Sequence, residues 1–185
     1  CDITFDGYDA PSLLQVAGAR DVALEFNSLS KTYNMAGWRV GMAVGNPEAV
    51  AALARVKTNI DSGMFRAIQD AAVLALTGDQ SWLAERNEIY RQRRDLIMEA
   101  LPELGMKAEK PQASLYIWAR VPEGYTSAGL ATRVLNEAGI SITPGTAFGQ
   151  QGEGYVRISL GADTDRIREA LERLRKLDLR APANA

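Results

Sequence analysis

The apolar residues of this chain change their spacing several times, and that change limits the architectures open to it. Where they alternate, the pattern predicts strands, and where they recur every three or four positions it predicts helices. We expect strands at 22–26, 39–44, 107–109, 115–121, 140–143 and 155–160, and helices from Asn46, at 65–76, from 79 or 81 to 101, at 127–138 and at 164–177. Short strands that alternate with helices favour an α/β sandwich of two layers.

Composition and charge are those of an ordinary globular chain. Apolar residues make up 46% and charged residues 24% of the 185 residues, which argues against disorder, collagen and coiled coil. The net charge is only −2, so no basic excess indicates nucleic acid or an acidic membrane as a partner. No apolar run approaches the roughly 20 residues of a membrane-spanning helix. Cys1 is the only cysteine and cannot form an internal disulfide, so the expected location is a reducing cytoplasm.

The chain contains no histidine. This absence excludes Ser-His-Asp and Cys-His catalysis, histidine-ligated zinc and an imidazole acid or base. We expect no metal site. Any chemistry must therefore use Lys, Asp, Glu, Tyr, Ser or a cofactor.

A long predicted helix that ends before Pro102 divides the chain. We expect a first domain over 1–80, a connecting helix over 81–101 and a second domain over 102–185. The helix carries four arginines that we expect to form a solvated face, as charge runs usually do: Arg86, Arg91, Arg93 and Arg94. The chain opens on Cys1 without a signal segment, and we interpret it as a fragment that begins inside a longer protein.

One connection between predicted strands concentrates groups that suit a phosphate and an aldehyde. We expect this polar segment, 27–38, to be a connection rather than core. A guanidinium fork matches two phosphate oxygens, a serine hydroxyl donates to a third, and a lysine amine can form a Schiff base with an aldehyde. Gly37 and Gly41 would let the backbone approach closely or turn. Together these groups describe a site for pyridoxal phosphate, built from Ser28, Ser30, Lys31 and Arg39.

The segment Ser28-Leu-Ser-Lys-Thr-Tyr-Asn-Met-Ala-Gly-Trp-Arg-Val-Gly41 closely resembles the signature of class I/II aminotransferases, the fold-type-I family of pyridoxal-phosphate enzymes. The resemblance implies that Lys31 carries the cofactor, that Arg39 and Ser28 bind its phosphate, and that Ser30 is a further contact. It covers almost the whole chain. It implies the end of the large cofactor-binding domain over 1–80, followed by a small α/β domain over 102–185.

A second candidate residue lies in the predicted strand 155–160. Val156, Ile158 and Leu160 share its apolar face, so Tyr155, Arg157 and Ser159 point the other way. A mid-strand arginine is costly to bury without an anionic partner. It could form a structural ion pair or bind a carboxylate through two parallel hydrogen bonds. The resembled family uses the arginine of this strand for the substrate α-carboxylate, and 142–149 resembles the loop that precedes it.

The resemblance implies an aminotransferase that moves an amino group from an amino acid to a 2-oxo acid, as a homodimer with shared active sites. Segments 30–39 and 57–63 are most similar to the LL-diaminopimelate aminotransferases, and then to the alanine aminotransferases. Two alternatives stay open. One is a pyridoxal-phosphate C–S lyase on the same fold, and the other is a non-catalytic aminotransferase-like domain that binds an effector.

The resemblance also implies groups that this chain does not contain. An acid that pairs with the pyridinium nitrogen, a tyrosine at the phenolic oxygen and a glycine-rich phosphate turn would all precede Cys1. Without the acid, the cofactor withdraws electrons only weakly. We therefore expect the 185-residue chain alone to be catalytically inactive.

Overall fold

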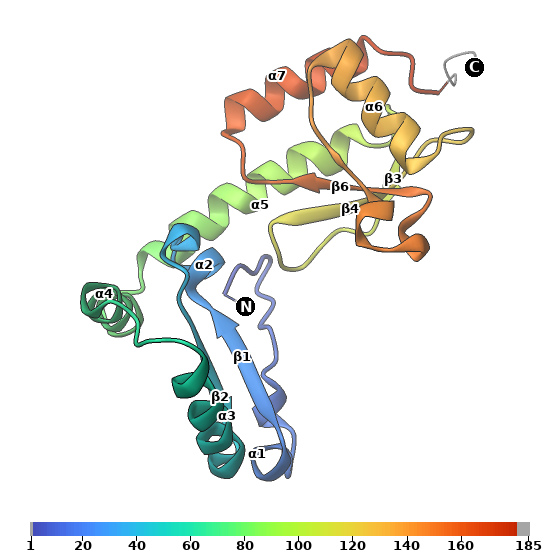
Figure 1. Cartoon of the computed structure of the whole chain (residues 1–185). Helices are drawn as coiled ribbons and strands as arrows, with labels where there is room; N and C mark the ends of the chain where they lie inside the picture. The colour runs from blue at the N-terminus through green and yellow to red at the C-terminus, as the bar shows by residue number, and fades with distance from the viewer. Residues whose placement is uncertain (1, 181–185) are drawn as a thin grey trace. The chain divides into compact units, whose positions relative to one another are not determined.

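The computed structural model describes residues 2–180, so the expectations for Cys1 lie outside the described residues. The chain has a mixed helix and strand fold, and the predicted α/β class is confirmed. It forms two compact units, Cys1–Glu85 and Arg86–Ala185 (Figure 1). The division into domains at 1–80, 81–101 and 102–185 stays a prediction.

The first unit is built on a two-stranded antiparallel sheet. β1 (Leu24–Ser28) pairs with β2 (Gly41–Gly45), and the register sets Ser28 opposite Gly41. The predicted start of the next helix is confirmed, because the Asn46 side chain accepts a hydrogen bond from the Ala49 amide at 2.8 Å. The helices of this unit are α1 (Ala19–Val22), α2 (Leu29–Thr32), α3 (Pro47–Ile60) and α4 (Arg66–Thr77), with 3-10 turns at Leu13–Gln15 and Ala36–Trp38.

Both strands predicted in this unit begin too early. Val22 ends α1 instead of beginning the strand, because the Ala23 amide closes a helical turn onto the Ala19 carbonyl. The second strand begins at Gly41, since Arg39 has a φ of 54°, which an extended strand does not allow. Arg39 therefore belongs to the connection and not to the sheet.

The connection between β1 and β2 contributes to the core, and the prediction that it would not is wrong. Leu29, Met35 and Val40 are buried together with Ala72 of α4. These residues lie in short turns, so neither a helical nor a strand spacing reveals them in the sequence. Their burial anchors the connection at three points and leaves Lys31 and Arg39 exposed.

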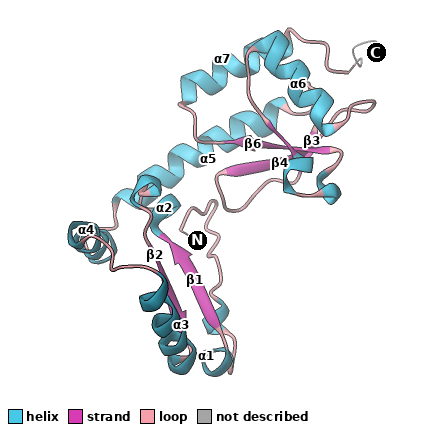
Figure 2. Cartoon of the chain, viewed as in Figure 1, coloured by secondary structure: helices cyan, strands magenta, loops and turns pink. Residues whose placement is uncertain are grey.

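The second unit packs helices on one face of a four-stranded sheet. The strand order is β3 (Lys107–Ala108), β4 (Tyr116–Arg120), β6 (Tyr155–Ser159) and β5 (Thr143–Pro144), and neighbouring strands are antiparallel. Figure 2 shows the helices of this unit against the sheet. They are α5 (Trp82–Ala100), which begins in the first unit, α6 (Ser127–Ala138) and α7 (Thr164–Arg175).

The predicted alternation in the last strand is confirmed. Val156 and Leu160 are completely buried beside Ile117 of β4, on the face that the helices cover. Tyr155 and Arg157 lie on the other face, where they are only partly buried. This second face carries the candidate functional side chains of the unit.

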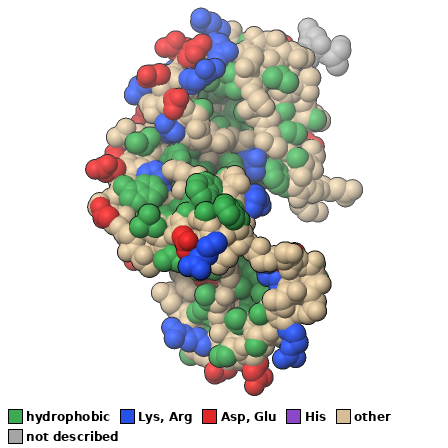
Figure 3. All heavy atoms as spheres, turned by 60° about the vertical axis from the view of Figure 1, so that its left-hand side comes forward, with side chains coloured by type: hydrophobic (Ala, Val, Ile, Leu, Met, Phe, Trp, Pro, Cys, Tyr) green, Lys and Arg blue, Asp and Glu red, His purple; other side chains and the backbone are tan. Residues whose placement is uncertain are grey.

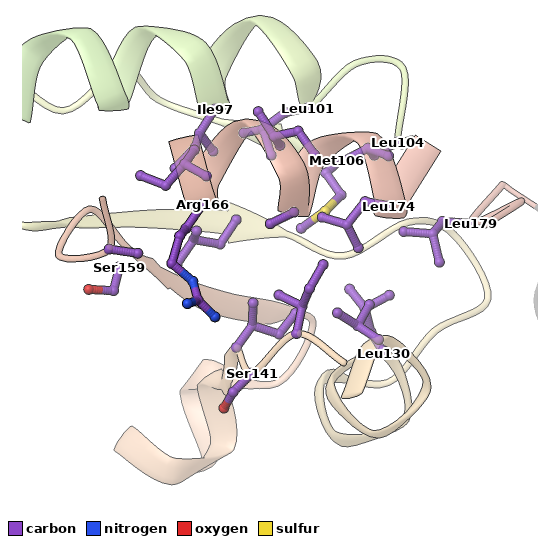
Figure 4. Close-up of a pocket in the computed structure, with 18 residues that line it drawn as sticks. Ile97, Leu101, Leu104, Met106, Leu130, Ser141, Ser159, Arg166, Leu174 and Leu179 are labelled. Carbon is purple, nitrogen blue, oxygen red and sulfur yellow. The ribbon is translucent and has the colours of Figure 1, made fainter. Parts of the chain in front are cut away.

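A cavity of about 310 Å³ lies inside the second unit (Figure 4). Its lining is mostly leucine and isoleucine from α5, α6, α7 and β6, with Arg166 and Ser141 among the few polar residues. The same side chains make up the core of this unit. The cavity therefore lies within the apolar core, on the helix side of the sheet. Arg157 does not line it.

The surface mixes charges of both signs with exposed apolar side chains (Figure 3). Large exposed apolar residues of the first unit include Phe26, Val56, Ile60, Phe65 and Leu74. No helix within residues 2–180 combines the length and the apolar character needed to cross a bilayer. Neither sign of charge forms a continuous field on the face in Figure 3, in keeping with the net charge of −2.

The arginines of α5 do not form the predicted solvated face. Arg94 is completely buried, and Arg86 is 8% exposed. Arg94 donates from Nε to Asp95 at 2.9 Å and from Nη1 to the Pro111 carbonyl at 3.0 Å. Asp95 also accepts from Arg91 at 2.7 Å. The spacing of charges could not show this, because the carbonyl acceptor lies beyond the helix.

Replacing Asp95 by alanine would remove the carboxylate that accepts from the buried Arg94 at 2.9 Å. We expect Asp95→Ala to lower the free energy of unfolding by about 3–5 kcal/mol, the usual effect of breaking a buried ion pair. Urea denaturation of the chain measures this. Glu88→Ala, which removes an exposed partner of Arg91, is the control and should have a much smaller effect. Equal losses for both variants would contradict the structural role assigned to Asp95.

Candidate functional site

The sheet closes the base of the connection that carries the candidate cofactor residues. Beyond the Ser28–Gly41 pair that ends the strand ladder, the Leu29 amide donates to the Val40 carbonyl at 3.2 Å. A residue larger than glycine does not fit at position 41, because its Cβ would lie 2.8 Å from the Asn27 carbonyl oxygen. The predicted close approach is confirmed for Gly41. No atom lies within 4 Å of a Cβ built on Gly37, so that glycine is not required by contacts among the described residues.

This closure brings the candidate phosphate-binding residues to one place in the chain. Ser28 and Ser30 flank Leu29, and Arg39 precedes Val40, so all three lie next to the same backbone hydrogen bond. The Ser28 hydroxyl accepts from the Ser30 amide at 3.2 Å and caps the single turn of α2. Two hydroxyls and a guanidinium are thus grouped at the end of β1.

Lys31 lies on the exposed side of α2. Leu29 and Thr32 of the same turn are buried, which directs Lys31 away from the core. Within residues 2–180, no hydrogen bond or ion pair holds its amine. Lys57, in contrast, is bound to Asp61 at 2.6 Å, and Lys110 lies 3.1 Å from Asp95. Lys31 therefore differs from these two lysines in having its amine available for a ligand.

Arg39 is held in a conformation that a non-glycine residue seldom adopts. Its φ is 54°, in the left-handed region, and its Nη1 donates to the Ala36 carbonyl at 2.9 Å. Such residues carry backbone strain and occur preferentially at functional sites. The side chain is exposed and only one of its donors is used in this bond, so the others remain for an anion.

Arg157 lies in the second unit and has a different environment. Its guanidinium carbon is 4.2 Å from the centre of the Tyr116 ring and 4.7 Å from the centre of the Phe148 ring. Its Nη2 makes one long contact of 3.5 Å to the Thr143 hydroxyl, and its buried Nε has no hydrogen-bond partner. No carboxylate of the described residues binds it. Of the two possibilities open for this arginine, a structural ion pair is thus absent within residues 2–180.

A tightly closed loop carries the Phe148 ring. Gly145 and Gly152 are in such close contact that a Cβ on either would lie 2.0–2.1 Å from the other's carbonyl oxygen. The Ser127 hydroxyl donates to the Gly152 carbonyl at 3.3 Å and accepts from the Tyr155 amide at 3.1 Å. The tip of the loop is therefore fixed from both ends, even though Phe148 is 54% exposed.

The carboxylate of Glu153 also holds this loop. It accepts from the Ser127 amide at 2.8 Å and from the Gly154 amide at 2.9 Å. These two bonds, with that from Ser127 the stronger, lower the pKa of Glu153 despite some opposing desolvation. The negative form of the carboxylate is the one that ties the loop to the start of α6.

Stability should depend on pH through this group. A carboxyl whose pKa is lowered in the folded state contributes stability above its unfolded pKa, and this contribution is lost as pH falls through the folded value. We expect the free energy of unfolding to fall more steeply below about pH 4.5 in the wild type than in Glu153→Gln. Urea titrations at a series of pH values test this, with the exposed Glu123→Gln as control. A wild-type pH dependence retained in Glu153→Gln would contradict the assignment.

The structure groups the predicted residues by unit. Ser28, Ser30, Lys31 and Arg39 lie together in the first unit, and Arg157 lies in the second. Tyr116 and Phe148, which contact Arg157, were not predicted as part of the site from the sequence. Tyr116 precedes Trp118 by two positions in a predicted strand, so its face could have been inferred. The pairing of that strand with β6 and the fold of the 145–152 loop could not.

An exposed lysine near two serines and an arginine, on an α/β fold, agrees with the class of protein that the sequence predicts. The family described as aminotransferase class I and II matches residues 2–174, and the chain belongs to this family. The resemblance seen in the sequence is thereby confirmed. Solved structures agree: substrate-bound BacF from Bacillus subtilis superimposes with a TM-score of 0.91 at 35% identity, over 99% of this chain and 47% of that one. An aromatic aminotransferase from Pyrococcus horikoshii gives 0.89 at 31% identity, over 95% and 48%.

Among curated proteins, the chain is similar to LL-diaminopimelate aminotransferases. It is 54% identical over 176 residues to that of Moorella thermoacetica, covering 95% of this chain and 45% of the relative. It is 56% identical over 167 residues to that of Nitratidesulfovibrio vulgaris, covering 90% and 43%. The chain thus spans less than half the length of these relatives.

The family depends on pyridoxal phosphate, and the residues of the first unit fit that group chemically. The free amine of Lys31 suits its aldehyde, and the guanidinium of Arg39 with the hydroxyls of Ser28 and Ser30 suits its phosphate. No group of three or more metal-ligating side chains was found in the part of the chain that the structure describes.

Proposed function

We propose that this chain is part of a pyridoxal-phosphate-dependent aminotransferase that moves an amino group from an amino acid to a 2-oxo acid. The observation that carries the proposal is Lys31, an amine without an ionic partner in residues 2–180, placed beside Arg39 and two serines. The names of the relatives support LL-diaminopimelate as the amino donor. Alanine or glutamate is the next donor to test.

Each of the four candidate residues of the first unit has a role in this proposal. Bound pyridoxal phosphate supplies an electron-withdrawing ring that makes the substrate Cα–H acidic. Ser28, Ser30 and Arg39 hold the phosphate and so fix the position of the aldehyde relative to Lys31. Lys31 would hold that aldehyde through Nζ, and the same amine, once free, would take the proton from the substrate Cα as a general base.

Arg157 of the second unit would bind the substrate α-carboxylate. A planar guanidinium can donate two parallel hydrogen bonds to a carboxylate. This one has no carboxylate partner among residues 2–180, so a substrate carboxylate would meet no internal competitor there. Fixing the carboxylate orients the Cα–H bond for the base.

The proposal includes the organisation of the complete protein. Residues 1–80 would end the large cofactor-binding domain, 81–101 would connect it to the small domain, and 102–185 would form that small domain. A cytoplasmic homodimer with shared active sites, and inactivity of this chain on its own, also belong to the proposal.

The two alternative functions have less support. A C–S lyase would use the same three residues, Lys31, Arg39 and Arg157, and would release a keto acid and ammonia instead of an exchanged amino group. An effector-binding domain would hold the ligand without turnover. The relatives are named as aminotransferases, and analysis of the products distinguishes all three functions.

Covalent attachment of the cofactor tests the role of Lys31. After borohydride reduction of the complete protein loaded with pyridoxal phosphate, we expect mass spectrometry to find the adduct on Lys31. Lys31→Ala should abolish the adduct, whereas Lys57→Ala and Lys110→Ala should keep it, because those amines are held by Asp61 and Asp95. An adduct on Lys57 or Lys110 would refute the assignment.

Steady-state kinetics test the role of Arg157. We expect Arg157→Ala to weaken binding of the amino acid and the oxo acid by about 2–5 kcal/mol, the usual loss for a desolvated charge pair, while cofactor binding stays nearly intact. Arg120→Ala removes an exposed arginine from a neighbouring strand and is the matched control. If Arg157→Ala released the cofactor and kept the affinity for substrate, the roles given to the two arginines would be exchanged.

A further inference from the structure

Two aromatic rings lie against the guanidinium of Arg157. Its central carbon is 4.2 Å from the Tyr116 ring centre and 4.7 Å from the Phe148 ring centre. Both distances are well inside the range of about 6 Å in which a cation is attracted to a ring. Tyr116 comes from β4 and Phe148 from the loop after β5, so two separate segments contribute the rings.

Aromatic rings and carboxylates interact with different parts of a guanidinium. An acidic partner would use the in-plane N–H donors and neutralise the charge. An aromatic face attracts the cation through the ring quadrupole and leaves those donors unused. In this chain the Nε of Arg157 is buried without a hydrogen bond, and Nη2 has only the long contact to Thr143. Besides this long contact to Thr143, the two rings orient the guanidinium.

The ring of Phe148 is itself well supported. It meets the Trp118 ring edge to face at 5.7 Å between centres, and Trp118 stacks on Tyr155 at 5.6 Å. The contact of Gly145 with Gly152 fixes the loop that carries it. A side chain that is 54% exposed would otherwise be free to move, so this support is notable for a residue without a core role.

We propose that Phe148 and Tyr116 are positioning residues, which hold the Arg157 guanidinium so that its free N–H edge meets the substrate carboxylate. This inference rests on the proposed function, because it takes Arg157 to be the carboxylate-binding residue. The two rings act through Arg157 and need no contact with substrate. Removing a ring lets the guanidinium rotate, and the carboxylate then binds a less ordered partner.

Steady-state kinetics of the complete, cofactor-loaded protein test the proposal. Phe148→Leu keeps an apolar side chain but removes the ring, and we expect it to raise KM for both substrates about three- to thirty-fold, with kcat changed less. Phe148→Tyr and Tyr116→Phe each keep a ring, so both should have the KM of the wild type. Tyr116→Leu loses its ring and should raise KM as Phe148→Leu does. The control is Leu135→Ala, which alters a side chain that is 52% exposed in the same unit.

A double-mutant cycle shows whether the ring acts through Arg157. In an Arg157→Gln background the guanidinium is absent, so Phe148→Leu should cause almost no further change in KM. An equal change in both backgrounds would mean that Phe148 contacts the substrate directly and would overturn the positioning role. An unchanged KM for Phe148→Leu in the wild-type background would overturn it as well.

Binding of propionate, measured by calorimetry, separates this inference from the proposed function because it requires no reaction. If Arg157→Ala binds propionate as tightly as the wild type, Arg157 is not the carboxylate site and the proposed role of that arginine fails. If Arg157→Ala loses propionate while Phe148→Leu and Tyr116→Leu bind it normally, only the positioning role fails. Weaker propionate binding in all three variants would support both the carboxylate-binding role of Arg157 and the positioning role of the two rings.

Discussion

Antiparallel strand register determines where the functional side chains of both units lie. In the first unit it sets Ser28 opposite Gly41 and leads directly to the Leu29–Val40 bond that closes the candidate cofactor loop. In the second unit it sets Trp118 opposite Arg157. Because side chains alternate between the faces of a strand, a slip of one residue would turn Arg157 into the apolar core. The core residues on the helix side therefore secure the position of the arginine on the other side.

Three cations of this chain, Arg94, Arg157 and Lys31, have three different environments, and each environment suits the role proposed for the residue. Arg94 is completely buried and bound by Asp95 and a backbone carbonyl, as a structural charge must be. Arg157 is held by aromatic faces, which keep its hydrogen-bond donors available. Lys31 is exposed and has no partner within the described residues. A charge that binds a ligand cannot also be paired with a carboxylate inside the protein. Of these three cations, only Arg94 has such a carboxylate partner among the described residues.

The long helices could be predicted from the sequence because they repeat one spacing over many residues. The helix expected at 127–138 agrees with α6, and that at 65–76 is displaced by one residue from α4. Short strands were less accurate, since two or three alternating residues compete with local turn geometry, as at Arg39. The chemistry of the 28–41 segment was visible because its residues are close in sequence. The rings around Arg157 and the burial of Arg94 depend on strand pairing and helix packing, which no local pattern contains.

The proposed reaction needs Lys31 and Arg157 to serve one substrate, yet each belongs to a different unit. Each unit fixes its own cation by local means: a closed loop with buried anchors for Lys31, and a strand face with two rings for Arg157. Substitutions around Lys31 should therefore affect only cofactor binding, and substitutions around Arg157 should affect only carboxylate binding. On this proposal, disturbing the rings would weaken carboxylate binding and leave the role of Lys31 intact, whereas disturbing the Leu29–Val40 closure would act on cofactor binding. This separation would let the affinity for substrate carboxylates change in the second unit without loss of the cofactor site in the first.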